Sequence, residues 1–336
     1  MRRSSRRTAI LVAAALAWPM LPALAAPPAC GGRDIAAELQ SSAPEAWGRI
    51  REAARATANG DAILWRLRTA AGRESHLFGT IHLTDERIVR LPPAADAALA
   101  SATTVALEVA DLSPATLAAS IARLQRLLVY TDGRSLSQFL SAEEQATAAK
   151  SLERAGMPSA ALAALKPWVV TMTMSLSDCE RQRTAAGLKP LDLRIGERGA
   201  AQGAPVVGLE TIEDQLLAMS AVPDADQLIV LRASLKLYAQ ADDMIETMVR
   251  RYLARDIGAV WPLQEELWRR AGFDTWAFQS FRRELVTRRN LRMRDAALPL
   301  IERGGAFIAV GALHLPGDDG LVALLRKAGL TAEPVE

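Results

Sequence analysis

Six short apolar segments, spread over both ends of the chain, constrain the fold most strongly. Each is rich in Val, Ile, Leu or Phe and is bounded by turn residues, which is typical of buried strands. They cover residues 62–68, 75–80, 104–109, 205–209, 306–311 and 331–335. A short turn containing Gly72 separates the first two and predicts a hairpin, whereas helical stretches between the others predict β-α-β crossovers. These segments together predict an α/β fold with a small mixed β-sheet.

Apolar residues at helical spacing fill most of the chain between these segments. The predicted helices cover residues 91–101, 113–129, 142–155, 167–176, 224–240, 241–255, 256–270 and 274–303. The sheet strands come from both ends of the chain, and no Gly/Ser linker divides it. We therefore expect one domain over residues 26–336, with long helical insertions at about 112–201 and 212–303.

The first 25 residues predict a secretory signal peptide. Four arginines among residues 1–7 precede an apolar run over residues 9–24, and small residues follow at the spacing of a cleavage site. A transmembrane anchor is the alternative, but Pro19 and Pro22 interrupt a run already shorter than the ~20 residues that a span needs. We expect an exported protein, periplasmic or secreted, without an integral membrane span after cleavage.

The charge and the cysteines of the predicted mature protein bear on its partners and its covalent structure. The chain has 40 basic and 38 acidic residues, and cleavage would leave 36 basic residues, so the mature protein is not basic. A nucleic-acid partner is therefore not expected, because nucleic-acid binding normally needs a strongly basic face. In an oxidising compartment the two cysteines, Cys30 and Cys179, predict a disulfide, with two buried free thiols as the alternative.

Two copies of the pattern Gly-x-x-His-Leu, at residues 79–83 and 311–315, each close an apolar strand. Ligands of open α/β sheets bind beyond the carboxyl ends of the strands, where these copies place His82 and His314. Glu108 ends a third apolar strand. Two imidazoles and one carboxylate can hold a divalent metal and leave positions open for water and substrate. We therefore predict His82, Glu108 and His314 as metal ligands.

Each predicted ligand also has a structural alternative. A single histidine after a strand is commonly a structural residue, and Glu108 could belong to a buried ion pair. The third histidine, His76, lies six extended residues before His82, about 20 Å away, and is not expected to share the metal.

Several segments resemble the TraB/PrgY/GumN family, which includes the Tiki-type membrane metalloproteases. The similarity covers residues 64–334, and Lys166-Pro167-Trp168 resembles the bacterial GumN-like branch. The segments are Leu77-Phe78-Gly79-Thr80-Ile81-His82-Leu83, Leu107-Glu108, Gly208-Leu209-Glu210-Thr211, Arg289-Asn290 and Val310-Gly311-Ala312-Leu313-His314-Leu315-Pro316-Gly317. The resemblance implies two pseudo-repeated β-α halves and a metal site made by the two histidines and Glu108. Family members with measured activity are described as divalent-cation-dependent peptidases. This chain departs from the family pattern at Arg288, which replaces an acid that often precedes the Arg-Asn pair.

These observations predict an exported, peptidase-like hydrolase that uses a divalent cation, Mn, Co or Zn, to cleave an amide bond. Its expected substrate is a peptide or another small amide or ester. Glu210 is the candidate general base, with capping of the next helix as its alternative role. Arg289 could stabilise developing negative charge, and Asn290 could orient the substrate or a ligand. Two other functions remain open: a non-catalytic binding or accessory protein of the cell envelope, and an esterase-type hydrolase.

Overall fold

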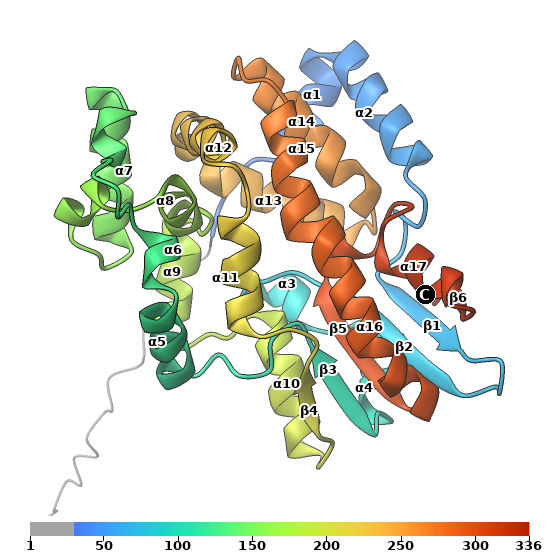
Figure 1. Ribbon diagram of the computed structural model, residues 1–336. Coiled ribbons are helices and arrows are strands. Elements are labelled where there is room, and N and C mark those ends of the chain that lie inside the picture. Colours follow the sequence, from blue (N-terminus) through green and yellow to red (C-terminus); the bar gives the residue numbers. More distant parts are fainter. Residues whose placement is uncertain (1–29, 336) are drawn as a thin grey trace, which may run out of the picture.

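A six-stranded mixed sheet forms the centre of the protein (Figure 1). The computed structural model describes residues 30–335. The strands are β1 (Leu64–Arg68), β2 (Glu74–Thr80), β3 (Thr104–Leu107), β4 (Val206–Gly208), β5 (Ala306–Gly311) and β6 (Thr331–Pro334). Their order is β4-β3-β5-β2-β1-β6; the first four are parallel, and β1 pairs antiparallel with both β2 and β6. The predicted α/β fold with a mixed sheet is confirmed, and all six predicted strands are present.

The local sequence explains how the strands are placed. β3 and β5 lie in the middle of the sheet and are almost continuously apolar, as expected of parallel strands that are covered on both faces. The hairpin between β1 and β2 turns at Gly72, whose positive φ of 75° suits glycine. Because β4, β3, β5 and β2 are parallel, their carboxyl ends meet at one edge of the sheet.

Helices cover both faces of the sheet. On one face lie α3 (Glu86–Val89), α4 (Pro93–Ala100), α10 (Leu191–Ala201) and α13 (Ala241–Leu253), and on the other lie α16 (Arg288–Arg303) and α17 (Leu321–Lys327). Figure 1 shows α16 in front of the sheet. Two glycines let α10 approach β3 closely, since a β-carbon at Gly199 would lie 2.6 Å from the side chain of Val105, and one at Gly196 would lie 2.9 Å from Leu107.

The two long stretches between strands are helical. Between β3 and β4 lie α5 (Pro114–Arg123), α6 (Gln125–Leu128), α7 (Ala142–Arg154), α8 (Pro167–Met174), α9 (Asp178–Ala185) and α10. Between β4 and β5 lie α11 (Ile212–Ser220), α12 (Asp224–Leu237), α13, α14 (Val260–Arg270), α15 (Trp276–Arg282) and α16. Helices α7, α8 and α12 bury a hydrophobic cluster of their own, beside the helices that cover the sheet (Figure 1).

Several helices differ from the sequence-based prediction. The helix expected directly after Glu210 is α11, but the periodicity did not identify α9 or α10, nor the N-terminal pair α1 (Ile35–Ser42) and α2 (Pro44–Ala56). The helix predicted over 113–129 is divided at Leu124 into α5 and α6. The helix predicted over 274–303 is α15 and α16 joined by a π-helical turn, which shifts the helical register without ending the helix.

The structure describes the predicted disulfide but not the predicted signal peptide. The signal peptide predicted for residues 1–25 lies outside the described residues. Cys30 and Cys179 form a disulfide, as predicted, with their Cα atoms 5.5 Å apart. Within residues 30–335, no helix has both the length and the apolar character needed to cross a membrane.

Candidate functional site

The carboxyl ends of three neighbouring strands carry the predicted metal ligands. His82 follows β2, Glu108 directly follows β3, and His314 ends a short 3-10 turn, Ala312–His314, that follows β5. Since β5 lies between β3 and β2 in the sheet, these three chain segments are neighbours. The structure therefore brings all three side chains to the same edge of the sheet.

The three side chains surround Gly311, the last residue of β5. A β-carbon added to Gly311 would lie 3.1 Å from Glu108 Oε1, 3.5 Å from His314 Cδ2 and 3.9 Å from His82 Nε2. The Gly311 N–H donates to Glu108 Oε1 at 2.6 Å, and His314 Nε2 is 3.7 Å from the same oxygen. Because Gly311 has no side chain, the position of its missing β-carbon lies open between two imidazoles and a carboxylate.

Asn290 on α16 orients His314. Its Nδ2 donates to the carbonyl of Asp319 at 2.8 Å, so its Oδ1 faces His314 Nδ1, at 2.6 Å, as an acceptor. The network therefore places the proton of the imidazole on Nδ1 and leaves the lone pair of Nε2 toward Glu108. Burial lowers the pKa of His314 to about 4, so the ring is neutral at pH 7.

Asp192, at the start of α10, holds His82. Its Oδ1 lies 3.0 Å from His82 Nδ1, which leaves Nε2 on the side of Gly311. Partial burial lowers the pKa of His82, but contact with Asp192 and the charges of Asp192 and Glu108 outweigh it and raise the pKa to about 9. Positive charge is therefore favoured at this place. More than half of the His82 side chain remains exposed to solvent.

Glu108 is the buried anion of the site. Its Oε2 accepts from Arg289 at 2.6 Å and from Gln215 at 3.1 Å, while Oε1 accepts from the backbone of Gly311. Burial raises the pKa of this carboxyl, but the positive charges around it and the Gly311 N–H hold the pKa well below its usual range. Glu108 is therefore ionised, and it is also the ion-pair member that the alternative interpretation describes.

Arg289 links Glu108 to Glu210, the strand-end acid beside it. Its Nε donates to Glu210 Oε2 at 2.9 Å, and Arg292 is 3.3 Å from the other oxygen, Oε1. Glu210 thus makes its described contacts with two arginines and with neither histidine. It also does not cap α11, because the side chain of Thr211 accepts from the backbone of Asp214 in a capping box.

Two residues of α9 hold the loop that follows His82, and the sequence did not identify them. Glu180 Oε2 accepts from the N–H and from the hydroxyl of Thr84, at 3.0 and 2.8 Å, and Arg183 donates to the carbonyl of Thr84 at 2.9 Å. Both side chains are buried. The disulfide between Cys179 and Cys30 fixes the start of the same helix. The position of this loop therefore depends on the first helical insertion.

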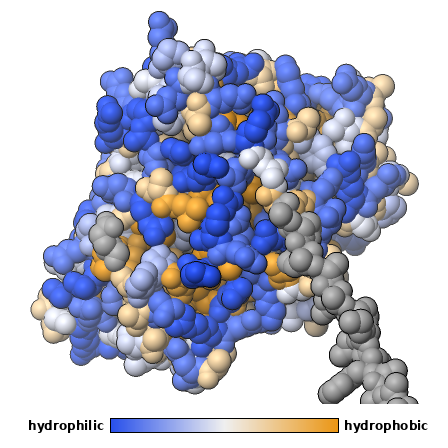
Figure 2. Space-filling view, turned by 180° about the vertical axis from the view of Figure 1, so that it is seen from behind, coloured by the Kyte–Doolittle hydropathy of each residue, from blue (hydrophilic) through white to orange (hydrophobic). Residues whose placement is uncertain are grey.

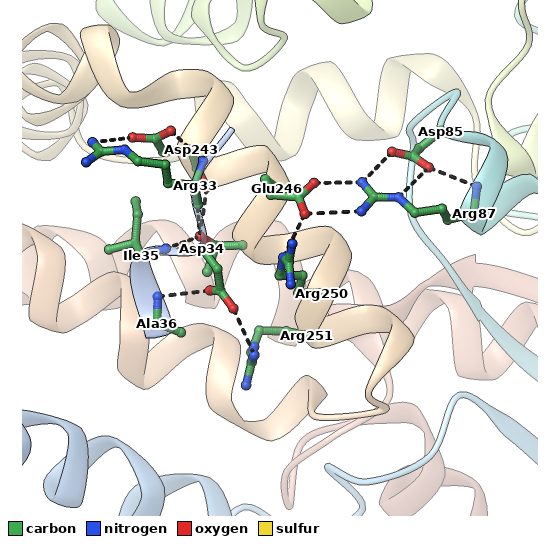
Figure 3. A network of polar contacts seen from close by, with 11 residues as sticks. Arg33, Asp34, Ile35, Ala36, Asp85, Arg87, Asp243, Glu246, Arg250 and Arg251 are labelled. Carbon is green, nitrogen blue, oxygen red and sulfur yellow. Dashed lines mark hydrogen bonds and ion pairs between the residues drawn. The ribbon is translucent and has the colours of Figure 1, made fainter. Parts of the chain in front are cut away.

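A second set of polar contacts fastens the same loop to α13 (Figure 3). Arg87 binds Asp85 at 2.7 Å and Glu246 at 2.6 Å, and Arg250 donates to Glu246 at 2.7 Å. Figure 3 also shows the N-terminal segment on α13, where the backbone and guanidinium of Arg33 bind Asp243. The sequence carries no motif for these contacts, because charged residues of this kind occur throughout the chain.

The donors at Gly311 have the chemistry, but not the closed geometry, of a metal site. Among residues 30–335, no three His, Cys, Asp or Glu side chains are arranged closely enough to hold a metal ion. Each imidazole nevertheless has Nδ1 held by an oxygen and Nε2 free, which is the usual arrangement of metal-binding histidines. The ionised carboxylate of Glu108 supplies a third donor, an oxygen of the type that zinc and manganese accept.

Comparison with known proteins identifies the relatives of this chain. The sequence model of the TraB/PrgY/gumN family matches residues 63–334. The uncharacterized protein YbaP of Shigella flexneri is 25% identical over 254 residues, which cover 76% of this chain and 88% of YbaP. No solved structure matches this chain significantly.

Proposed function

Because this chain belongs to the TraB/PrgY/gumN family, we propose that it is an exported, divalent-metal-dependent hydrolase of peptidase type. One observation carries the proposal: a β-carbon at Gly311 would lie within 4 Å of Glu108 Oε1, His314 Cδ2 and His82 Nε2, and His314 Nε2 lies 3.7 Å from the same Glu108 oxygen. His82, Glu108 and His314 would hold the cation. The cation would polarise an amide carbonyl and make a water molecule more acidic.

The other residues of the site act on these three ligands. Asn290 fixes the tautomer of His314. Asp192 faces Nδ1 of His82, so a cation would bind His82 through Nε2 in place of the proton that this nitrogen carries when the ring is charged. Arg289 keeps Glu108 ionised and in place through a 2.6 Å contact. We assign Arg289 and Asn290 positioning roles, because their polar groups are already bonded to the protein.

Glu210 remains the candidate general base. Its carboxylate is almost fully buried and is held by Arg289, the residue that also holds Glu108. The two strand-end acids therefore differ in role: Glu108 lies with the histidines, and Glu210 lies one strand further, where its oxygens are bound by arginines. Glu210 would accept a proton only after its 3.3 Å ion pair with the partly exposed Arg292 breaks.

A non-catalytic envelope protein of the same fold is the second candidate. The absence of a closed metal-holding cluster within residues 30–335 favours it. In that case the ion pairs of Glu108 and Glu210 with Arg289 would serve stability alone, and no variant of the site would change a reaction rate.

Metal analysis of the purified mature protein separates these candidates. The wild type, His82→Ala and His314→Ala are each supplied with Mn, Co or Zn and analysed by calorimetry and elemental analysis. We expect the wild type to retain one of these cations and both variants to lose it, because each substitution removes one of three donors.

His76→Ala is the matched control, because His76 lies in the middle of β2 and not at the site. Equal and negligible retention in the wild type and both variants would refute the metal site. Hydrolysis of a peptide or ester library by the wild type, lost in His314→Ala and Glu210→Ala, would exclude the non-catalytic function, and the preferred members would separate peptidase from esterase activity.

A further inference from the structure

A groove of about 720 Å³ lies along α10, on the face of the sheet opposite to α16. Figure 2 shows the protein from this side, where hydrophobic residues are visible between hydrophilic ones near the middle. The volume lies in the range of ligand-binding clefts. Aliphatic side chains from three segments form its floor: Val89, Leu91, Leu99, Leu188, Leu191 and Ile195.

The charged rim of the groove is unbalanced. Its two acids are both neutralised, Asp96 by Arg198 and Glu197 by Lys189. The remaining cations, Arg90 and Arg194, are exposed and have no ion-pair or hydrogen-bond partner for their guanidinium groups among residues 30–335. The groove therefore combines an aliphatic floor with two positive charges that the protein itself does not neutralise.

One end of the groove lies beside the candidate site. Leu191 lines the groove, and the next residue, Asp192, holds His82. On the other wall, Val89 lies in the segment that follows the His82 loop. The rest of the groove runs along α10, which rises about 1.5 Å per residue over 11 residues and so offers a length of about 16 Å. An extended chain of about five residues has this length.

We propose that this groove binds an extended peptide segment that combines aliphatic and acidic side chains, and presents the residue next to it to His82. The aliphatic side chains would cover the floor, and the carboxylates would pair with Arg90 and Arg194. The inference rests on the proposed function in naming the peptide class of the same site, but binding in the groove does not itself require hydrolysis.

The test is a fluorescence-anisotropy titration in EDTA, where binding is measured without turnover. The probe is a labelled octapeptide of Leu, Val and Glu, and two further peptides replace all Glu with Lys or all Leu and Val with Ser. The wild type should bind the Glu peptide most tightly. Replacing both arginines, Arg90→Gln with Arg194→Gln, should weaken binding of the Glu peptide by about threefold to tenfold, as expected for two exposed ion pairs.

Charge reversal is the stronger measurement. Arg90→Glu with Arg194→Glu should make the Lys peptide the preferred ligand, and neither substitution removes a side-chain hydrogen bond or ion pair among residues 30–335. The control is Arg55→Gln with Arg126→Gln, two exposed arginines on α2 and α6 that also have no ion pair among residues 30–335.

Equal binding of the Glu and Lys peptides by the wild type, or equal loss in the control, would overturn the proposal. Failure of the groove and failure of the proposed function are distinguishable in this design. Peptide binding that responds to the arginines, without any hydrolysis in the presence of metal, would leave the groove standing and contradict the hydrolase. Hydrolysis that is insensitive to the arginines would do the reverse.

Discussion

The substitution Gly311→Ala tests the candidate site with little change to the fold. The backbone of Gly311 has φ −52° and ψ 133°, a conformation that alanine adopts without strain. The new methyl group would stand 3.1 Å from Glu108 Oε1, so the carboxylate must shift by a few tenths of an ångström. Such overpacking costs about 1 kcal/mol at the low end of its range, because the carboxylate is the end of a side chain.

A second term offsets this cost. Replacing glycine by alanine in an allowed conformation stabilises a protein by about 0.4–1 kcal/mol, because the unfolded chain loses freedom. The two terms nearly cancel, and we expect the free energy of unfolding to change by less than about 1 kcal/mol. The methyl group nevertheless fills the space between the two imidazoles and Glu108, so cation affinity should fall by at least about tenfold to hundredfold.

The assay pairs urea denaturation with calorimetric titration of Mn, Co and Zn. Gly48→Ala is the control, since Gly48 lies in α2 and no atom would lie within 4 Å of its added carbon. This control should gain about 0.5–1 kcal/mol in stability and bind cations as the wild type does. Wild-type affinity in Gly311→Ala would refute the argument that the reacting space lies at Gly311.

Three further variants test the contacts that support the site. Arg289→Met leaves the buried Glu108 without an arginine and Glu210 with Arg292 alone, and should lower the free energy of unfolding by about 3–5 kcal/mol in urea titrations; a loss below about 1 kcal/mol would contradict the buried ion pairs. The double variant Cys30→Ser with Cys179→Ser opens a link between residues 149 positions apart and should cost up to about 5 kcal/mol, matched by reduction of the wild type; thermal unfolding that is unchanged would refute it. Hydrogen bonds from Arg87 lower the pKa of Glu246, so its ionised form stabilises the fold above the unfolded pKa of about 4.3, and this contribution is lost as the pH falls through the lower folded pKa. Glu246→Gln should therefore lose less stability than the wild type between about pH 5 and pH 3, and an equal loss would contradict this linkage.

The strands were predictable because burial imposes a pattern on them. Parallel strands such as β3 and β5 are covered on both faces and become short continuous apolar runs, which stand out between helices. Helix α10 was not predictable in the same way, because Gly196 and Gly199 interrupt its apolar stripe. Those glycines are needed for close packing on Val105 and Leu107, a tertiary requirement that helical periodicity does not contain.

The gathering of His82, Glu108 and His314 followed from position alone. Each ends or follows a strand, and the parallel pairing of β2, β5 and β3 brings strand ends together whatever their order in the chain. Asp192 carried no such signal. It comes from an unpredicted helix, and its role appears only when α10 is packed against the strand-end loops.

The same distinction separates the ligands from the residues that hold them. The groups that would touch a cation lie at strand ends, whereas the residues that fix the His82 loop, Glu180 and Arg183, come from a helical insertion almost 100 positions away in sequence. The insertion is therefore more than an addition to the sheet. Thr84 has its N–H, hydroxyl and carbonyl bonded to Glu180 and Arg183 of α9, and α9 is fastened by the disulfide at Cys179, so a substitution of either side chain acts on the His82 loop directly and not through the sheet.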